Sequence, residues 1–147
     1  MLIGIATDHG GLDLKQQVQD YLKELGHEVK DFGAYEYDAA DDFPDFVIPL
    51  ARAVGEGSVD RGIAVCGSGV GASIAANKIK NVRACLITES YSARQGVEHD
   101  DMNMICLGGR VIGIALAQEF VDNFLGATYQ AKERQLRRMG KVAALEK

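Results

Sequence analysis

The clearest chemical capability in this chain lies in the segment from residue 61 to residue 77. A short apolar run at residues 63–65 precedes the glycine-rich residues 66–71, and small residues at helical spacing follow. This order predicts a strand, a tight loop and a helix. Glycines let a loop approach a ligand closely, and its amides together with the first helical turn can bind negative charge. The segment therefore predicts an anion or oxyanion site.

Cys66 stands where the predicted strand ends, beside those amides. A positive potential there favours the thiolate, so Cys66 could act as a base or a nucleophile. Two other interpretations remain open. The glycines could serve only to turn the chain, and a cysteine that ends a strand is more often a small buried apolar residue than a catalyst.

Two histidines also occupy positions that suit chemistry. His9 follows Asp8 at the end of a predicted first strand, and His99 closes a short predicted helix, whose C-terminus would stabilise a charged imidazole. Lone histidines are usually structural or exposed residues. A cysteine base, a histidine acid/base and an oxyanion loop together suit proton abstraction next to a carbonyl.

The elements that must position these residues alternate along the chain. Strands are predicted over residues 2–6, 28–32, 63–65, 82–87 and 104–107, and the helices over residues 14–25, 46–54, 91–98, 111–126 and about 131–145, with one more after residue 71. This rhythm indicates an α/β fold with a parallel sheet. Ligands bind beyond the carboxyl ends of such strands, so Asp8, His9, residues 66–71 and Arg110 should converge there.

Composition sets the broad class. The 147 residues, 47% hydrophobic and 25% charged, predict a single soluble domain over residues 1–147, with no membrane span and no leader, hence a cytoplasmic protein. The net charge of −5 argues against nucleic-acid binding. The odd set of Cys66, Cys85 and Cys106, without a Cys-x-x-Cys pair, indicates reduced thiols and neither a disulfide frame nor a zinc site.

The last predicted helix carries a basic stripe at i, i+3 and i+7, formed by Arg134, Arg137 and Lys141, with Arg138 beside it. A solvated basic face is the commoner meaning of such a pattern. Phosphate binding is the functional alternative, because the arginine fork suits phosphate. The stripe could reach the loop of a neighbouring chain.

Taken together, these motifs resemble the ribose-5-phosphate isomerase B / galactose-6-phosphate isomerase family. The match runs over nearly the whole chain and includes Asp8-His9-Gly10-Gly11, Asp42-Phe43-Pro44, residues 66–71 with 73–78, His99, residues 109–113 and Arg137. The resemblance implies a Rossmann-like three-layer α/β/α sandwich with a five-stranded parallel sheet. It also implies a homodimer with shared active sites, possible pairing into tetramers, and an aldose–ketose isomerase that uses no metal and no cofactor.

The resemblance also assigns roles. Cys66 would move a proton from C2 to C1 through an enediolate, Ser68 would assist by hydrogen bonding, and His99, with Asp8 nearby, would open the sugar ring. The substrate would be bound by His9, Asp42, Gly67, Gly69, Val70, Gly71, Asp100, Arg110, Arg134 and Arg137.

Two positions depart from the family pattern. Asp100 replaces a usual asparagine, and Glu133 replaces a usual arginine. Asp100 would repel a phosphate or bind a hydroxyl more tightly, and Glu133 removes one positive contact unless Arg134 or Lys132 replaces it. Ribose 5-phosphate is the first expectation for the substrate, and a tetrose phosphate, a hexose phosphate such as galactose or allose 6-phosphate, or a free sugar stays open.

Two other classes of function compete with an isomerase. The pattern Gly67-x-Gly69-x-x-Ala72 after a strand, with Glu89 further on, fits a loose dinucleotide-binding fingerprint. The cysteine that opens the loop and the lack of a second domain count against it. A catalytically silent sugar-phosphate sensor is the other alternative, and the retained Cys66 and His99 count against that.

Overall fold

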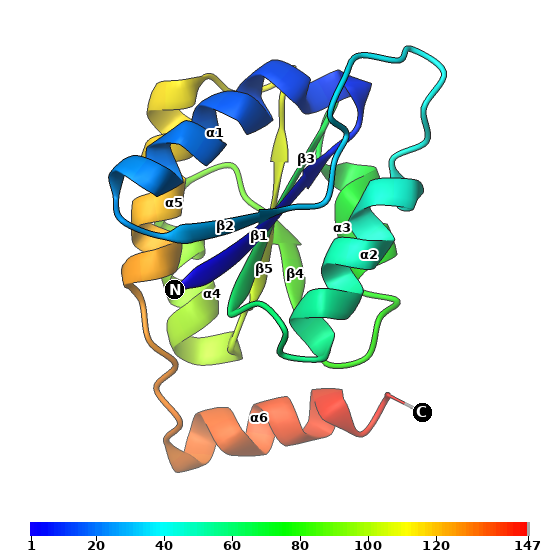
Figure 1. Ribbon diagram of the computed structural model, residues 1–147. Helices are drawn as coiled ribbons and strands as arrows, with labels where there is room; N and C mark the ends of the chain where they lie inside the picture. The colour runs from blue at the N-terminus through cyan, green and yellow to red at the C-terminus, as the bar shows by residue number, and fades with distance from the viewer. Residues whose placement is uncertain (147) are drawn as a thin grey trace.

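The computed structural model describes residues 1–146 as a sheet between two layers of helices (Figure 1). All the strand pairs are parallel, and the five strands lie in the order β2-β1-β3-β5-β4. The strands are β1 (Leu2–Thr7), β2 (Glu28–Asp31), β3 (Arg61–Cys66), β4 (Ala84–Leu86) and β5 (Met104–Gly108). The predicted five-stranded parallel sheet is confirmed.

The helices divide between the two faces of that sheet. They are η1 (His9–Gly11), α1 (Leu12–Glu24), α2 (Pro44–Gly55), α3 (Val70–Ala76), α4 (Ser90–Asp100), α5 (Ile114–Gly126) and α6 (Glu133–Ala143). One apolar cluster joins α1, α4 and α5 to the sheet, and a second joins α2 and α3 to its other face. The Rossmann-like three-layer α/β/α sandwich is therefore confirmed, with α6 lying apart from both layers (Figure 1).

Alternation along the strands explains the two clusters, because successive side chains of a strand point to opposite faces. In β3, Ile63 and Val65 join the cluster under α1, α4 and α5, while Ala64 and Cys66 join the cluster under α2 and α3. The second face is built largely from small residues, which lets α2 and α3 lie close to the sheet. Cys66 thus has its side chain on the α2/α3 face.

The observed bounds differ from the predicted ones at a few ends. Strand β4 is shorter than residues 82–87, and α5 begins at Ile114 instead of residue 111. The second difference has a local cause, because the N–H groups of Val111 and Ile112 both donate to the carbonyl of Gly108 in a turn after β5. The short helix η1 was not predicted. Helix α2 continues past the exposed Pro49.

Strand order places the turns that carry the candidate site. The chain pairs β2 with one side of β1 and β3 with the other side. Ligands in open α/β sheets bind where the strand order reverses in this way, outside the carboxyl ends of the strands. The turns after β1 and β3 therefore flank the expected crevice. Within residues 1–146, no helix has the length and apolar character that a membrane span requires.

Candidate active site

Three glycine-containing turns meet at the carboxyl edge of the sheet, after β1, β3 and β5. A Cβ on Gly10 would lie 2.8 Å from the Gly67 nitrogen, and a Cβ on Gly109 would lie 2.7 Å from the Gly10 carbonyl oxygen. The Gly109 N–H donates to the Cys66 carbonyl at 2.8 Å, and the Arg110 N–H donates to the Gly67 carbonyl at 3.0 Å. The predicted convergence of the turns is confirmed. The turns meet through close contacts between backbone atoms.

The loop after β3 directs its amides inward. Gly69 has φ +87°, a left-handed conformation that glycine adopts without strain, and it forms the N-cap of α3. Its N–H donates to Cys66 Sγ at 3.1 Å, and the Val70 N–H donates to Ser68 Oγ at 3.3 Å. A Cβ on Gly71 would lie 2.7 Å from the Phe43 ring, so Phe43 covers the start of α3. The loop thus places a fixed N–H donor beside the sulfur.

Cys66 itself is only 5% exposed and belongs to the cluster with Ala72 and Cys106. A structural cysteine would be expected to be equally buried. The Gly69 N–H, however, donates to the sulfur, and such a donor stabilises a negatively charged sulfur. Cys106, in the middle of β5, differs because burial raises its pKa far above the ordinary value, and the sulfurs of Cys66 and Cys85 add to that shift. Cys66 is therefore the cysteine whose position suits chemistry.

Asp8 and His9 follow β1 directly at this edge. The buried Asp8 accepts a hydrogen bond from the Gly10 N–H at 2.9 Å, which fixes the turn. His9 Nδ1 lies 2.5 Å from Asp41 Oδ1, and the His9 backbone N–H donates to the same oxygen at 3.1 Å. His9 also lines a cavity of about 210 Å³ together with Gly10, Gly109 and Tyr37.

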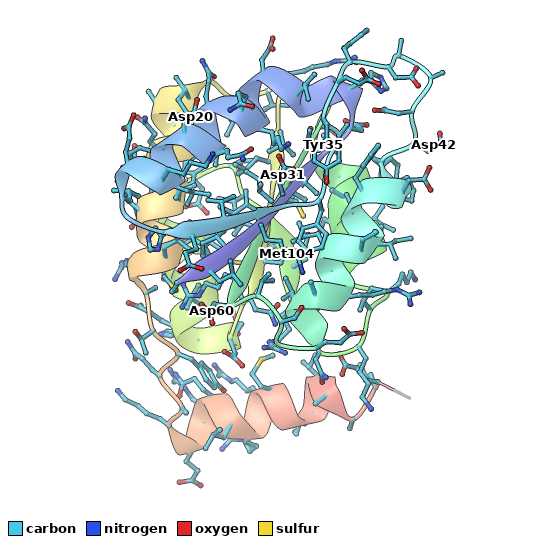
Figure 2. All side chains as sticks on the ribbon, in the orientation of Figure 1. Asp20, Asp31, Tyr35, Asp42, Asp60 and Met104 are labelled. Atoms are coloured by element: carbon cyan, nitrogen blue, oxygen red, sulfur yellow. The ribbon has the colours of Figure 1, made fainter. Side chains whose placement is uncertain are left out.

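The acidic loop before α2 places Asp41 next to His9, whereas the sequence prediction chose Asp42. Asp42 is exposed, and Figure 2 shows it on the outer side of that loop. Side by side in sequence, the two aspartates are distinguished only by the path of the loop. No sequence pattern identified Asp41 in advance.

Arg110 follows β5 at the same edge. Its side chain passes over the loop, since a Cβ on Gly67 would lie 3.8–3.9 Å from atoms of the Arg110 side chain. Arg110 is exposed at its position after β5. One guanidinium is therefore available beside the amides of residues 67–71.

The remaining predicted residues lie at the opposite, amino edge of the sheet. Helix α4 runs from the carboxyl end of β4 back to the start of β5, so His99 and Asp100 come just before Met104. Because Met104 pairs with Gly62 and Gly108 pairs with Cys66, His99 is separated from Cys66 by four residues of strand, or roughly 13 Å along the sheet. His99 Nδ1 contacts Gln95 Nε2 at 3.1 Å. Within one chain, Asp8 and His99 therefore lie at opposite edges.

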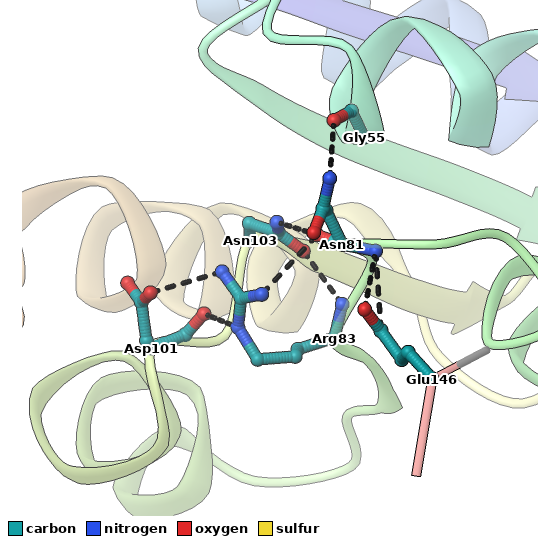
Figure 3. Close-up of polar contacts among 6 residues, drawn as sticks. All are labelled: Gly55, Asn81, Arg83, Asp101, Asn103 and Glu146. Carbon is teal, nitrogen blue, oxygen red and sulfur yellow. Dashed lines mark hydrogen bonds and ion pairs between the residues drawn. The ribbon is translucent and has the colours of Figure 1, made fainter. Parts of the chain in front are cut away.

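Helix α6 lies below this amino edge (Figure 1). Arg134 and Arg137 are exposed on it, which agrees with the predicted basic stripe. Figure 3 shows the polar contacts that hold the segment between α3 and β4 near the end of α6. There the Asn81 N–H donates to both Glu146 carboxylate oxygens at 3.1 and 3.2 Å, and Arg83 Nη2 contacts Asp101 Oδ2 at 2.9 Å.

The structure thus divides the predicted site residues into two groups. The carboxyl edge holds Asp8, His9, Cys66, Gly67, Ser68, Gly69, Val70, Gly71 and Arg110, and the amino edge with α6 holds His99, Asp100, Arg134 and Arg137. Asp42 stands outside both groups. Besides Asp41, sequence reasoning missed the close packing of Gly10 against Gly67 and Gly109, for which the sequence signal was the presence of glycines directly after β1, β3 and β5.

Comparison with known proteins now decides the family. A family model described as Ribose/Galactose Isomerase matches residues 3–142. The chain belongs to this family of ribose and galactose isomerases. The predicted resemblance to ribose-5-phosphate isomerase B and galactose-6-phosphate isomerase is confirmed, and so is the prediction of an aldose–ketose isomerase.

Individual relatives match over almost their full length. Ribose-5-phosphate isomerase B of Escherichia coli (strain K12) is 41% identical over 144 residues, which cover 98% of this chain and 95% of the relative. The structure of ribose-5-phosphate isomerase B of Clostridium thermocellum is 47% identical with a TM-score of 0.95, covering 99% of this chain and 97% of the other. That of Mycoplasma genitalium, with bound ribulose-5-phosphate, is 39% identical with a TM-score of 0.93, covering 99% and 95%.

Proposed function

We propose that this isomerase interconverts the aldose and ketose forms of a small sugar phosphate, with ribose 5-phosphate and ribulose 5-phosphate as the first pair. The observation that carries the proposal is the meeting of three glycine turns around Cys66 in a chain of this family. Relatives named ribose-5-phosphate isomerase B, one of them with bound ribulose-5-phosphate, support the choice of sugar.

In the proposed mechanism, the Cys66 thiolate takes the proton from C2 of the open-chain aldose. The C2–H electron pair forms the C1–C2 double bond, and the carbonyl electrons move to O1, which gives an enediolate. The thiol returns its proton to C1, the electron pair of O2 forms the C2 carbonyl, and the hydroxyl proton of O2 passes to O1. The amides of Gly67 to Gly71 and the Ser68 hydroxyl would hold the oxyanion.

The amino-edge residues enter this mechanism through a second chain. His99 would open the sugar ring with the help of Asp8, while His9, Arg110, Arg134 and Arg137 would hold substrate and phosphate. Because Asp8 and His99 lie at opposite edges of one sheet, one chain does not bring this set together. We therefore propose a homodimer in which the carboxyl edge of one chain faces the His99 end of its partner.

Exposed apolar residues support such an assembly. On and just after α6, Leu136, Val142 and Leu145 are 54%, 49% and 79% exposed, and Ile74 on α3 is 61% exposed. Several exposed apolar residues on one helix are what a protein–protein contact would cover. In this proposal residues 1–147 form one domain whose last helix packs on a partner, and dimers could pair into tetramers. The cytoplasmic location and the lack of nucleic-acid binding stay predictions.

A different sugar phosphate is the second candidate. The family model covers galactose as well as ribose isomerases, and Asp100 is an exposed carboxylate at the end of α4 beside His99. A carboxylate there accepts hydrogen bonds from a hydroxyl and repels a phosphate. A hexose 6-phosphate, which places its phosphate one carbon further from the reacting atoms, could use this site.

A substrate panel tests the proposal. The purified full-length chain is given four-, five- and six-carbon aldose and ketose phosphates, with the free sugars alongside, and interconversion is followed for each. Turnover of ribose 5-phosphate above all others is expected. Turnover of a hexose phosphate alone would select the second candidate, while NAD(H) binding in a fluorescence titration, with no sugar converted, would return the dinucleotide-binding alternative.

A further inference from the structure

Asp41 makes an unusual set of contacts with His9. One carboxylate oxygen, Oδ1, lies 2.5 Å from His9 Nδ1 and 3.1 Å from the His9 backbone nitrogen, so the same oxygen holds both the ring and the main chain. The Asp41 side chain is 9% exposed and the His9 side chain 24% exposed. A largely buried carboxylate therefore fixes the ring at Nδ1, and the ring is partly exposed to solvent.

The loop that carries Asp41 is itself braced. The Asp41 N–H donates to the Asp38 carbonyl at 3.1 Å, and Asp38 Oδ1 accepts the Ala40 N–H at 2.9 Å, which forms a tight turn just before Asp41. The ring of Tyr37 from the same loop meets the His9 ring edge-on at a centroid distance of 6.0 Å. One loop thus places a carboxylate at Nδ1 and an aromatic ring against the imidazole.

The two carboxylate oxygens of Asp41 differ in their contacts. Asp41 Oδ2 is buried and has no hydrogen-bond partner among residues 1–146. A buried acceptor without a partner costs free energy. The contact with His9 is what Asp41 gains at this position.

A metal ion is a poor explanation for this cluster, although ligand atoms of Asp8, His9 and Asp41 lie within 4.8 Å of one another. Two ligands of one tetrahedral ion, each about 2.1 Å from the metal, stand roughly 3.4 Å apart. The 2.5 Å between Nδ1 and Oδ1 is a hydrogen-bond distance instead.

We propose that Asp41 is a positioning residue for His9. When the imidazole is neutral, Asp41 holds its proton on Nδ1, so that Nε2 accepts a hydrogen bond from a hydroxyl of the sugar in the cavity beside Gly10 and Gly109. A carboxylate on one ring nitrogen fixes which nitrogen carries the proton. This role rests on the proposed sugar substrate, while the tautomer itself is a property of the free protein.

The first test needs no substrate. Long-range ¹H–¹⁵N NMR of the ¹⁵N-labelled full-length protein reports which ring nitrogen of His9 is protonated, and His9→Gln assigns the signal. The Nδ1–H tautomer is expected in the wild type and its loss in Asp41→Ala. Asp38→Asn is the matched control, because it removes the same charge from the same loop and keeps an oxygen for the Ala40 N–H. An unchanged His9 tautomer in Asp41→Ala would overturn the proposal.

The second test is kinetic. Asp41→Ala should lower kcat/KM about tenfold, mainly through a higher KM, because the sugar loses one oriented hydrogen-bond acceptor. Asp41→Asn, nearly the same shape, guards against a folding defect and should show the same direction. In the double variant with His9→Gln, the Asp41 substitution should add nothing further, because it acts through His9. Additive losses would overturn the proposal, whereas a tautomer that changes in a protein that converts no sugar would count against the proposed function instead.

Discussion

The two edges of the sheet differ in how much one chain completes. At the carboxyl edge, backbone atoms of three turns lie so close that no side chain fits at Gly10 or Gly109, and the sulfur of Cys66 accepts a hydrogen bond from the Gly69 N–H. At the amino edge, the groups of interest stand on the last turn of α4 and on the exposed α6. The carboxyl edge is already assembled within one chain. The amino edge supplies side chains that, in the proposed mechanism, need a partner surface to form a site.

This difference follows from connectivity. A helix that joins parallel strands must return the chain to the opposite edge, so the end of α4 and the end of β3 are separated within one chain. Residues of both kinds form one site only if a second copy supplies the missing half. The comparison therefore predicts that catalytic defects at the two edges are independent and can complement each other.

The largest expected effect comes from the centre of the carboxyl edge. Cys66→Ala removes the proposed base and should lower kcat for isomerisation by about a thousandfold or more, because a positioned acid/base contributes that order of rate. The fold should persist, since alanine replaces a small buried side chain. The measurement is kcat with the best sugar phosphate of the panel.

Cys85→Ala is the control for this variant, because Cys85 lies exposed on the edge strand β4. It should retain wild-type kcat. Full activity in Cys66→Ala would show that Cys66 is a structural residue of the α2/α3 face. The carboxyl edge would then not supply the base.

Mixing two inactive variants tests the shared site directly. Cys66→Ala is defective at the carboxyl edge and Arg137→Ala at α6, so a dimer of one copy of each keeps one intact site of two. Random exchange in an equal mixture should restore about a quarter of wild-type activity, since about half of the dimers are mixed. Subunit exchange is verified with differently tagged copies. Subunit exchange without recovery of activity would show that the active site of each chain uses α6 of the same chain, or does not use α6.

A stability difference separates the close-packed edge from open positions. Gly109→Ala would bring a Cβ to 2.7 Å from the Gly10 carbonyl and 2.8 Å from the Gly11 Cα, both backbone atoms that cannot move aside cheaply. The free energy of unfolding should fall by about 2 kcal/mol, as for other overpacked sites. Gly113→Ala, with nothing within 4 Å, should change it by less than about 1 kcal/mol. Urea denaturation measures both, and equal values would contradict the crowding.

The sequence was informative wherever a local pattern maps onto a local structure. Residues 63–71 already contain a buried strand, a glycine loop and a small-residue helix, and alternation with helices implies parallel strands whose carboxyl ends share an edge. The contact between Asp41 and His9 could not be predicted, because no local pattern indicates it. The place of Asp41 next to His9 depends on a long loop with no periodic pattern, and nothing in the run Asp41-Asp42 says which aspartate points inward.

The smallest expected effect concerns Asp100, at the C-terminal end of α4. Partial desolvation and, secondarily, the Asp100 carboxylate raise the pKa of the exposed Cys85 on β4, so the negative charge of Asp100 acts on its surroundings. Asp100→Asn should raise kcat/KM for ribose 5-phosphate by up to about fivefold, the range for an exposed charge interaction, and high salt should shrink the gain. Asp101→Asn is the matched control, because its carboxylate faces Arg83 and its left-handed backbone suits asparagine. An equal gain in both variants would indicate a general charge effect, and unchanged kinetics in Asp100→Asn would show that its carboxylate does not oppose this phosphate.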